Sequence, residues 1–236
     1  MNSAQNSQHD TVLVIAAHPD DEVLGCGGAI AKHCQRGDSV HILILAEGAT
    51  SRSLTRSRTH WESELTALSI AARNASKILG ADSTTLHHFP DNRMDSCDLL
   101  EIIKPIESVI DQRQPAIVYT HHSGDVNIDH RRIHDAVVTA CRPIPKHPVK
   151  SLLFFEIPSS TEWQPPGSAA PFLPNWHVNI SETLTLKLEA LAAYDSEMRQ
   201  WPHPRSLQAV KYLAHWRGAS VGVEAAESFI LGRHLD

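Results

Sequence analysis

The chain has 236 residues, of which 21 are Lys or Arg and 27 are Asp or Glu, so its formal net charge is −6 at pH 7. This negative charge argues against a protein that binds nucleic acid or an anionic membrane over a broad basic surface. With 42% hydrophobic and 20% charged residues, the composition is that of a globular protein and excludes intrinsic disorder for most of the chain.

Cysteine spacing and apolar run length exclude two further classes. The four cysteines form no C-x-x-C pair, so neither a disulfide framework nor an all-thiolate zinc site is expected. The longest apolar run, residues 12–17, is too short to span a membrane, and residues 1–10 lack the pattern of a signal peptide. We therefore expect a reduced, cytoplasmic protein with no membrane insertion. Its 16 histidines, many beside aspartates, direct attention to metal or proton chemistry.

Short apolar runs alternate with helical patterns over the first two thirds of the chain. We expect strands at 12–17, 40–46, 84–89, 116–120 and 152–157, and helices at 29–35, 56–79, 99–112 and 131–141. This alternation predicts an α/β protein, a three-layer sandwich with a mostly parallel, Rossmann-like sheet.

The rest of the chain has a different pattern. Residues 158–174 read as a loop rich in Ser, Pro and Gly, and residues 181–236 read as mostly helical. About 80 residues of loop and helix would make a weak core alone. We therefore expect a single domain over 1–236, with a Rossmann-like core at 1–157 and a helical C-terminal extension at 158–236 packed on it.

Titratable residues follow the first and fourth predicted strands. The two runs are Ala17-His18-Pro19-Asp20-Asp21-Glu22 and His121-His122-Ser123-Gly124-Asp125-Val126-Asn127-Ile128-Asp129-His130. These strands are neighbours in the usual doubly wound order, so both loops should converge on one crevice outside the carboxyl ends of the sheet. Histidine, carboxylate and histidine there form a ligand set with room for water, as a catalytic zinc site requires. A solvated strand end is the alternative for the first run taken alone.

Both runs resemble the signature motifs of the LmbE-like, or PIG-L-like, zinc-dependent N-deacetylases. The resemblance covers most of the chain through Ala46-Glu47-Gly48-Ala49-Thr50-Ser51-Arg52, Pro90-Asp91-Asn92, Tyr194-x-Ser196-Glu197, Pro202-His203-Pro204-Arg205-Ser206 and Ala226-Glu227-x-Phe229. It implies a zinc-dependent amidohydrolase that removes acetyl from an N-acetylglucosamine-type sugar or glycoconjugate precursor. It also implies a small-molecule acetylated sugar as substrate and a homo-oligomeric assembly.

Matched by position, the resemblance assigns the metal ligands to His18, Asp21 and His130, and the general base to Asp20. Zn²⁺ is the expected ion, although imidazole–carboxylate sites also accept Fe²⁺ or Co²⁺. The assignment agrees with the chemistry of the residues. A metal lowers the pKa of its bound water towards about 7, and the adjacent Asp20 carboxylate can take a proton as that water attacks an acetamide carbonyl.

The sequence departs from the family pattern beside the second motif. Where the family often has His and several members place a Tyr, this chain has Asn127 and Asp125. The Asn127 amide can donate to an oxyanion but cannot deliver a proton. We therefore expect protonated Asp20 to return its proton to the leaving amine, with His203 as an alternative oxyanion or acid group. Asp129 either orients a metal-bound histidine or stabilises a helix N-terminus.

Several polar residues are candidate substrate contacts. They are Arg52, Asp91, Asn92, Arg93, Asp125 and Arg205. Charged and bidentate donors of this kind suit sugar hydroxyl groups, and Arg52 or Arg93 could also clamp a phosphate. The alternative for each loop residue is a merely solvated side chain.

Two other functions stay open at this point. One is hydrolysis of a non-sugar amide by the same site, and the other is a catalytically idle sugar- or nucleotide-binding α/β domain. The run Gly25-Cys26-Gly27-Gly28 does not have the G-x-G-x-x-G spacing of dinucleotide-binding proteins. Close backbone packing beneath the first motif is the better interpretation of these glycines.

Overall fold

The structure is a computed structural model that describes residues 9–236. Residues 1–8, part of the segment in which we expect no signal peptide, lie outside the described residues. In the described part, seven strands form one sheet in the order β3-β2-β1-β4-β5-β7-β6. They are β1 (Thr11–Ala16), β2 (Ser39–Ala46), β3 (Ser83–Phe89), β4 (Ile117–His121), β5 (Ser151–Phe155), β6 (Trp176–Asn179) and β7 (Ala226–His234). Strands β1 to β5 run parallel to one another, whereas β7 runs antiparallel to β5 and β6.

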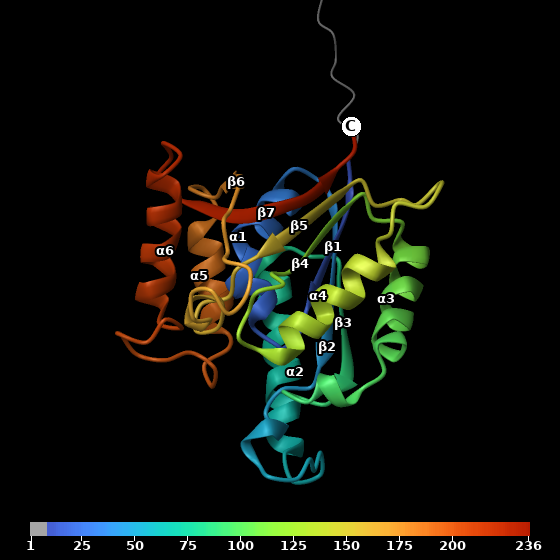
Figure 1. Cartoon of the computed structure of the whole chain (residues 1–236). Helices are drawn as coiled ribbons and strands as arrows, with labels where there is room; N and C mark the ends of the chain where they lie inside the picture. The colour runs from blue at the N-terminus through green and yellow to red at the C-terminus, as the bar shows by residue number, and fades with distance from the viewer. Residues whose placement is uncertain (1–8) are drawn as a thin grey trace, which may run out of the picture.

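Helices cover both faces of the sheet, which confirms the predicted three-layer α/β sandwich (Figure 1). They are α1 (Asp21–Gln35), α2 (Glu62–Leu79), α3 (Leu99–Arg113), α4 (Ile128–Ala140), α5 (Leu184–Ala192) and α6 (Leu207–Ala219), with 3-10 turns η1 (Thr50–Arg52), η2 (Met94–Ser96) and η3 (Thr161–Trp163). One hydrophobic cluster joins the sheet to α1, α2 and α5, and a second joins it to α3 and α4.

The alternating side chains of β1 explain these two clusters. Val12 and Val14 belong to the cluster with α1, whereas Leu13 and Ile15 belong to the cluster with α3 and α4. All four side chains are fully buried. A strand that is apolar on both faces needs a helical layer on each side, so the continuous apolar run in the sequence already indicates a central strand.

The glycine run of α1 allows close packing, as predicted. A Cβ at Gly25 would lie 2.5 Å from the Phe155 ring, and one at Gly28 would lie 2.8 Å from Ile180. Both contacts are closer than carbon atoms tolerate, so only glycine lets α1 approach β5 and the segment after β6 this closely. The helix also begins at Asp21, well before the predicted start at residue 29.

The C-terminal part differs from the prediction by two strands. Helices α5 and α6 lie where helical segments are predicted, but β6 and β7 extend the sheet beyond β5. The short apolar run of β7 around Phe229 does not distinguish a strand from a buried helical turn by its pattern alone. Pairing with β5 over Phe154 and Phe155 decides the outcome.

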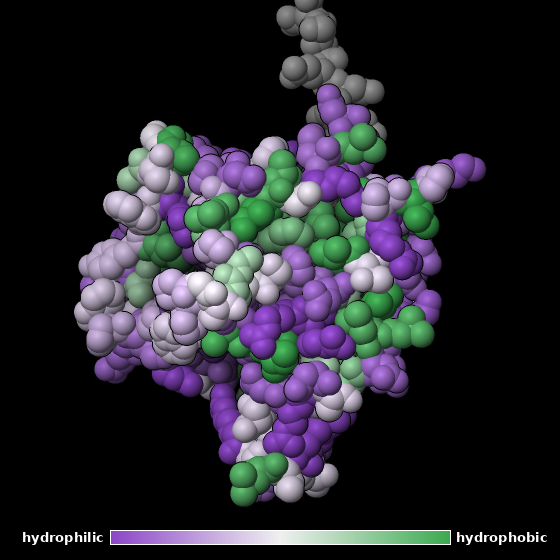
Figure 2. Space-filling view, viewed as in Figure 1, coloured by the Kyte–Doolittle hydropathy of each residue, from purple (hydrophilic) through white to green (hydrophobic). Residues whose placement is uncertain are grey.

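The helices, one face of the surface and the cysteines add three observations. Within residues 9–236, no helix combines the length and apolar character needed to cross a membrane. On the face drawn in Figure 2, hydrophobic residues are interspersed with hydrophilic ones. All four cysteines are unpaired, as expected from their spacing.

Candidate metal and catalytic site

Three metal-ligating side chains meet where β1 and β4 lie side by side. His18 follows β1, Asp21 is the first residue of α1, and His130 lies in the first turn of α4. The Asp21 Oδ2 atom is 3.2 Å from His18 Nδ1 and 3.2 Å from His130 Nε2. One ligand atom from each residue lies within 4.8 Å of the others. The two predicted loops therefore converge at the topological switch point of the sheet.

Two atoms of this group lack hydrogen-bond partners although they are buried. Among the described residues, neither Asp21 Oδ1 nor His130 Nε2 has a partner. Unpaired polar atoms in a protein interior are costly and call for a ligand. A divalent cation held by two imidazoles and a carboxylate fits these atoms and the spacing of the three side chains.

Carboxylates stand behind both histidines. Asp129 Oδ2 lies 3.0 Å from His18 Nε2, and Asp125 Oδ2 lies 3.2 Å from His130 Nδ1. Burial lowers the pKa of the His130 imidazole, but the Asp21 and Asp125 carboxylates outweigh burial and raise this pKa to about 9. The site therefore favours positive charge. Carboxylates in this position also fix the orientation of a ligating imidazole.

A second cluster shares His18 with the first. His18, Asp91 and Asp129 also bring ligand atoms within 4.8 Å of one another. However, Asp129 already accepts hydrogen bonds from the backbone N–H groups of Asn92 and Met94, at 2.6 and 2.9 Å. Because the unpaired atoms belong to Asp21 and His130, the first cluster fits a cation better.

Asp125 does not lie where the sequence analysis expects it. We expect a substrate contact, but Asp125 is 1% exposed and does not line the polar pocket of about 180 Å³ beside the cluster, which is described below. Its carboxylate accepts hydrogen bonds from the Ser160 and Thr161 hydroxyls and from the Asn127 N–H. It is therefore a buried partner of His130, and the spacing within the motif could not distinguish these two positions.

Asp20 carries its carboxyl beside the cluster on a strained backbone. Its φ is +112°, in a region that non-glycine residues rarely adopt. The Asp20 N–H donates to Glu22 Oε2 at 3.1 Å, and Arg205 Nη1 donates to Asp20 Oδ2 at 3.1 Å. Burial raises the pKa of the Asp20 carboxyl well above its usual range, although Arg205 acts in the opposite direction.

A polar pocket of about 180 Å³ opens in front of these side chains. The predicted site residues that line it are His18, Asp20, Arg52, Asp91, Asn92, Asn127 and Arg205. The Asn127 Nδ2 donates to Asn92 Oδ1 at 2.9 Å in the pocket wall, while its Oδ1 caps α4 by accepting from the Asp129 N–H. Larger cavities lie elsewhere on the described part of the chain, but none of the three clustered residues lines these cavities, whereas His18 lines this pocket.

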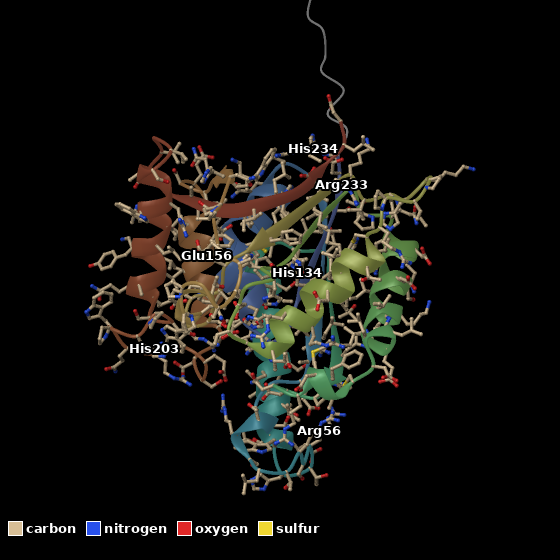
Figure 3. All side chains as sticks on the ribbon, viewed as in Figure 1. Arg56, His134, Glu156, His203, Arg233 and His234 are labelled. Atoms are coloured by element: carbon tan, nitrogen blue, oxygen red, sulfur yellow. The ribbon has the colours of Figure 1, made fainter. Side chains whose placement is uncertain are left out.

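Arg93 and His203, which were expected to contact the substrate or the reacting groups, do not line the pocket. The Arg93 guanidinium donates to the backbone carbonyls of Ser53 and Leu54. His203 lies on the loop between α5 and α6 (Figure 3), and its Nδ1 accepts from the Arg205 N–H at 3.1 Å. His203 is neither among the three clustered residues nor in the pocket lining, and the side chain that reaches Asp20 from this loop is Arg205.

Four residues with no role expected from the sequence contact the site. They are Glu22, Tyr194, Glu197 and His121. The Tyr194 hydroxyl donates to the Glu22 carboxylate, and the same carboxylate accepts a hydrogen bond from the Asp20 N–H. Glu197 binds Arg52 at the pocket rim. The His121 ring stacks on His130 with centroids 4.0 Å apart. Glu22 stands within the first motif, but the contacts of Tyr194 and Glu197 join distant segments and have no local signal.

The fold and this geometry can be compared with those of known proteins. The sequence profile of the PIG-L family, described as GlcNAc-PI de-N-acetylase, matches residues 13–141. This stretch carries β1 to β4 and all three clustered ligands. The match therefore covers the part of the chain that builds the candidate metal site.

Individual relatives extend the likeness to most of the chain. An Escherichia coli K12 protein named uncharacterized deacetylase YaiS is 32% identical over 78% of this chain and 90% of its own. The diacetylchitobiose deacetylase of Thermococcus kodakarensis is 28% identical over 79% of this chain and 69% of its own. The structure also resembles GalB, the 4-carboxy-2-hydroxymuconate hydratase of Pseudomonas putida KT2440, with a TM-score of 0.75, 20% identity, and 96% and 98% of the two chains covered. That last likeness concerns the fold alone.

Proposed function

This chain belongs to the PIG-L family of deacetylases, and we propose that it hydrolyses the acetamido group of an N-acetylglucosamine-type sugar or glycoconjugate precursor. One observation carries the proposal. His18, Asp21 and His130 gather around one point, and the Asp20 carboxyl, which Arg205 contacts through one oxygen, lines a polar pocket together with His18. This arrangement supplies a cation site and a proton acceptor side by side, which are the two components of metal-assisted amide hydrolysis.

His18, Asp21 and His130 would hold the metal ion, which we propose to be Zn²⁺, with Fe²⁺ or Co²⁺ as alternatives. When bound, such an ion acts as a Lewis acid that makes water more acidic and polarises a carbonyl group. The protein keeps both imidazoles oriented through Asp129 and Asp125.

Asp20 is the proposed general base. Its carboxylate takes a proton from water as the water oxygen attacks the acetamide carbonyl carbon. When the carbon–nitrogen bond breaks, Asp20 returns that proton to the departing nitrogen, so the products are acetate and a free amine. Arg205 holds Asp20 Oδ2 and keeps the carboxyl directed at the pocket. His203 is not needed for this step.

Asn127 is the proposed donor to the oxyanion that develops on the carbonyl oxygen. Its Nδ2 lies in the pocket wall, where it donates to the Asn92 side chain. A substrate oxygen can replace this side-chain acceptor, and one such donor stabilises a transition state by about 3 kcal/mol in other enzymes.

The remaining pocket residues are proposed to bind the sugar. Arg52, Asp91 and Asn92 line a pocket of about 180 Å³ whose lining is predominantly polar. Its small volume suits one sugar ring with its acetamido group, and the rest of a larger substrate would extend past the rim. Its lining offers both donors and acceptors, and sugar hydroxyl groups can pair with either.

Acetate release tests the proposal. The purified, metal-analysed protein is incubated with N-acetylglucosamine, N,N'-diacetylchitobiose and an N-acetyl amino acid, and both acetate and amine are quantified. We expect release from the sugars and a loss of about two to four orders of magnitude in turnover for Asp20→Asn. The control is Asp95→Asn, which makes the same change at an exposed position.

Three outcomes would contradict the proposal in different ways. Release from the amino acid alone would indicate a non-sugar amide as substrate. Identical behaviour of Asp20→Asn and the unmodified protein in every assay would indicate a catalytically idle binding domain. Activity that persists after complete removal of metal would exclude the metal ion from the reaction.

A further inference from the structure

A chain of alternating charges runs along one side of the pocket. Arg52 Nη2 donates to Glu197 Oε1 at 2.7 Å, and Glu197 Oε2 lies 3.8 Å from Arg205 Nη1. The same Arg205 nitrogen donates to Asp20 Oδ2 at 3.1 Å. The Glu197 side chain is 12% exposed, so this carboxylate is largely withdrawn from water. Both pocket guanidinium groups are therefore already matched by carboxylates of the protein.

The arginines nearest to the pocket are also occupied. Arg93 donates to two backbone carbonyls. Arg56 and Arg58, on the segment that leads into α2, both bind Glu47 (Figure 3 labels Arg56). All three guanidinium groups are therefore engaged, although only Arg56 and Arg58 face a carboxylate, which they share. The titratable side chains that line the pocket itself are His18, Asp20, Asp91, Glu197, Arg52 and Arg205.

This arrangement affects neutral and anionic ligands differently. A phosphate or carboxylate binds well when a guanidinium offers two parallel donors to it. Arg52 can do so only by leaving Glu197, whose negative charge would then lie unpaired beside the anion. A hydroxyl group both donates and accepts, so it can bridge a guanidinium and a carboxylate without separating them.

We propose that Glu197 makes this site selective for acetylated sugars whose attached group is neutral, and that it discriminates against phosphate- or carboxylate-bearing conjugates. The inference rests on the proposed deacetylase function and names its substrate class. Glu197 acts by neutralising Arg52, so the chain excludes the anionic conjugates that Arg52 alone would accept. This reverses the expectation that Arg52 or Arg93 clamps a phosphate.

Two substrates that share the acetylated sugar and differ in the group on its anomeric oxygen test the proposal. They are the methyl glycoside of N-acetylglucosamine and N-acetylglucosamine 1-phosphate. For the unmodified protein we expect kcat/KM to be at least about tenfold higher for the methyl glycoside. The Glu197→Gln substitution keeps the shape of the side chain. In this variant we expect the ratio of kcat/KM for the methyl glycoside to kcat/KM for the phosphate to fall by about tenfold, through a lower KM for the phosphate.

A matched control separates local from general charge effects. Glu156 (Figure 3) forms a bidentate pair with Arg217 at 2.8 and 2.7 Å, has an 18% exposed side chain, and does not line the pocket. Glu156→Gln therefore removes the same charge from a similar ion pair. We expect it to leave the ratio of the two substrates unchanged.

Calorimetric titration of both glycosides adds a readout that does not depend on turnover. We expect the phosphate to bind to the unmodified protein with a higher Kd than the methyl glycoside. In Glu197→Gln we expect this difference in Kd to become smaller or to change sign. A preference for the phosphate in the unmodified protein, or an unchanged ratio in Glu197→Gln, would overturn the proposal. Failure of the deacetylase function is distinguishable, because acetate would then be released from neither glycoside while the titrations still rank them.

Discussion

Asp20 presents its carboxyl to the pocket from a backbone conformation that residues with a side chain rarely adopt. A φ of +112° at such a residue costs about 1–3 kcal/mol. The Asp20 N–H donates to the Glu22 carboxylate, and the Asp20 carbonyl accepts from the Leu24 N–H at 2.9 Å. These contacts hold the strained residue and fix the direction of the proposed base. The strained backbone conformation therefore contributes to the orientation of the Asp20 carboxyl, the proposed base.

A second buried carboxylate, Asp38, gives a stability prediction at the same scale. Asp38 Oδ2 lies 2.6 Å from His33 Nδ1, and His33 Nε2 lies 3.0 Å from the Tyr119 hydroxyl. Burial lowers the pKa of His33, which keeps this ring neutral, donating to Asp38 and accepting from Tyr119. Burial alone would raise the pKa of Asp38, but the bonds from His33 and the Asp10 N–H outweigh it and hold this pKa below its usual value.

We therefore expect Asp38→Asn to lower the free energy of unfolding by about 2 kcal/mol at neutral pH. Because the folded-state pKa is depressed, the contribution is complete above about pH 4, the pKa of an unfolded Asp. It is lost as the pH falls through the folded-state value. Urea unfolding of both proteins from about pH 7 to about pH 3 measures this difference. Asp111→Asn, at an exposed position on α3, is the control, and an equal difference at both ends of the range would contradict the prediction.

Single residues were predictable where their position along a strand decided their place. His18 and Asp21 follow β1, and His130 follows β4, so strand order alone brings them to one edge. The partner of Asp20 was not predictable in this way. Arg205 is 185 residues away in the sequence, and a contact across that separation depends on how the last helices pack.

Helix α1 is interrupted in its middle, and a side chain of β7 binds the backbone N–H groups that the interruption leaves without helical partners. Cys26 has non-helical angles (φ −148°, ψ 24°), so the backbone N–H groups that follow it lack helical partners. The Glu227 carboxylate on β7 accepts from the N–H groups of Gly28 and Ala29 at 2.9 and 2.7 Å. Lys187 on α5 pairs with Glu227 and also donates to the Leu24 carbonyl. This pair therefore joins α1, α5 and β7.

We expect Glu227→Gln to destabilise the protein by about 3–5 kcal/mol, because it leaves the Lys187 ammonium buried without its counter-charge. Lys187→Met should do the same to Glu227. The double variant should lose less than the sum of the two single losses, because neither buried charge is then left alone. Guanidinium unfolding of the four proteins measures this coupling, and strictly additive losses would show that the two side chains act independently.

The same contact explains which elements the sequence could predict. The parallel core follows from apolar runs and the polar loops between them. Strand β7 is held by pairing with β5 and by Glu227, whose partners on α1 lie about 200 residues earlier, and β6 pairs in turn with β7. No pattern within residues 176–179 or 226–234 contains that information, so a helical extension was the expectation from sequence.

At the scale of the whole molecule, the proposed cation site connects separate parts of the sheet edge. His18 and Asp21 stand at the β1–α1 junction and His130 stands on α4, on the opposite face of the sheet. A cation bound there would join the two helical layers. The two hydrophobic clusters do not include the ligand side chains, so we expect the protein to remain folded, though less stable, without the ion.

We therefore expect chelation to lower the melting temperature and added Zn²⁺ to restore it. A ligand that binds only the folded state at 100 times its Kd stabilises by about 2.7 kcal/mol, which corresponds to about 5–10 °C for a chain of this length. His130→Asn should remove this dependence on metal. His122→Asn is the matched control, because His122 is equally buried beside the cluster but donates to the Ala170 carbonyl at 2.9 Å. Scanning calorimetry of the three proteins with and without chelator decides the matter, since a metal-dependent shift that persists in His130→Asn would place the ion elsewhere.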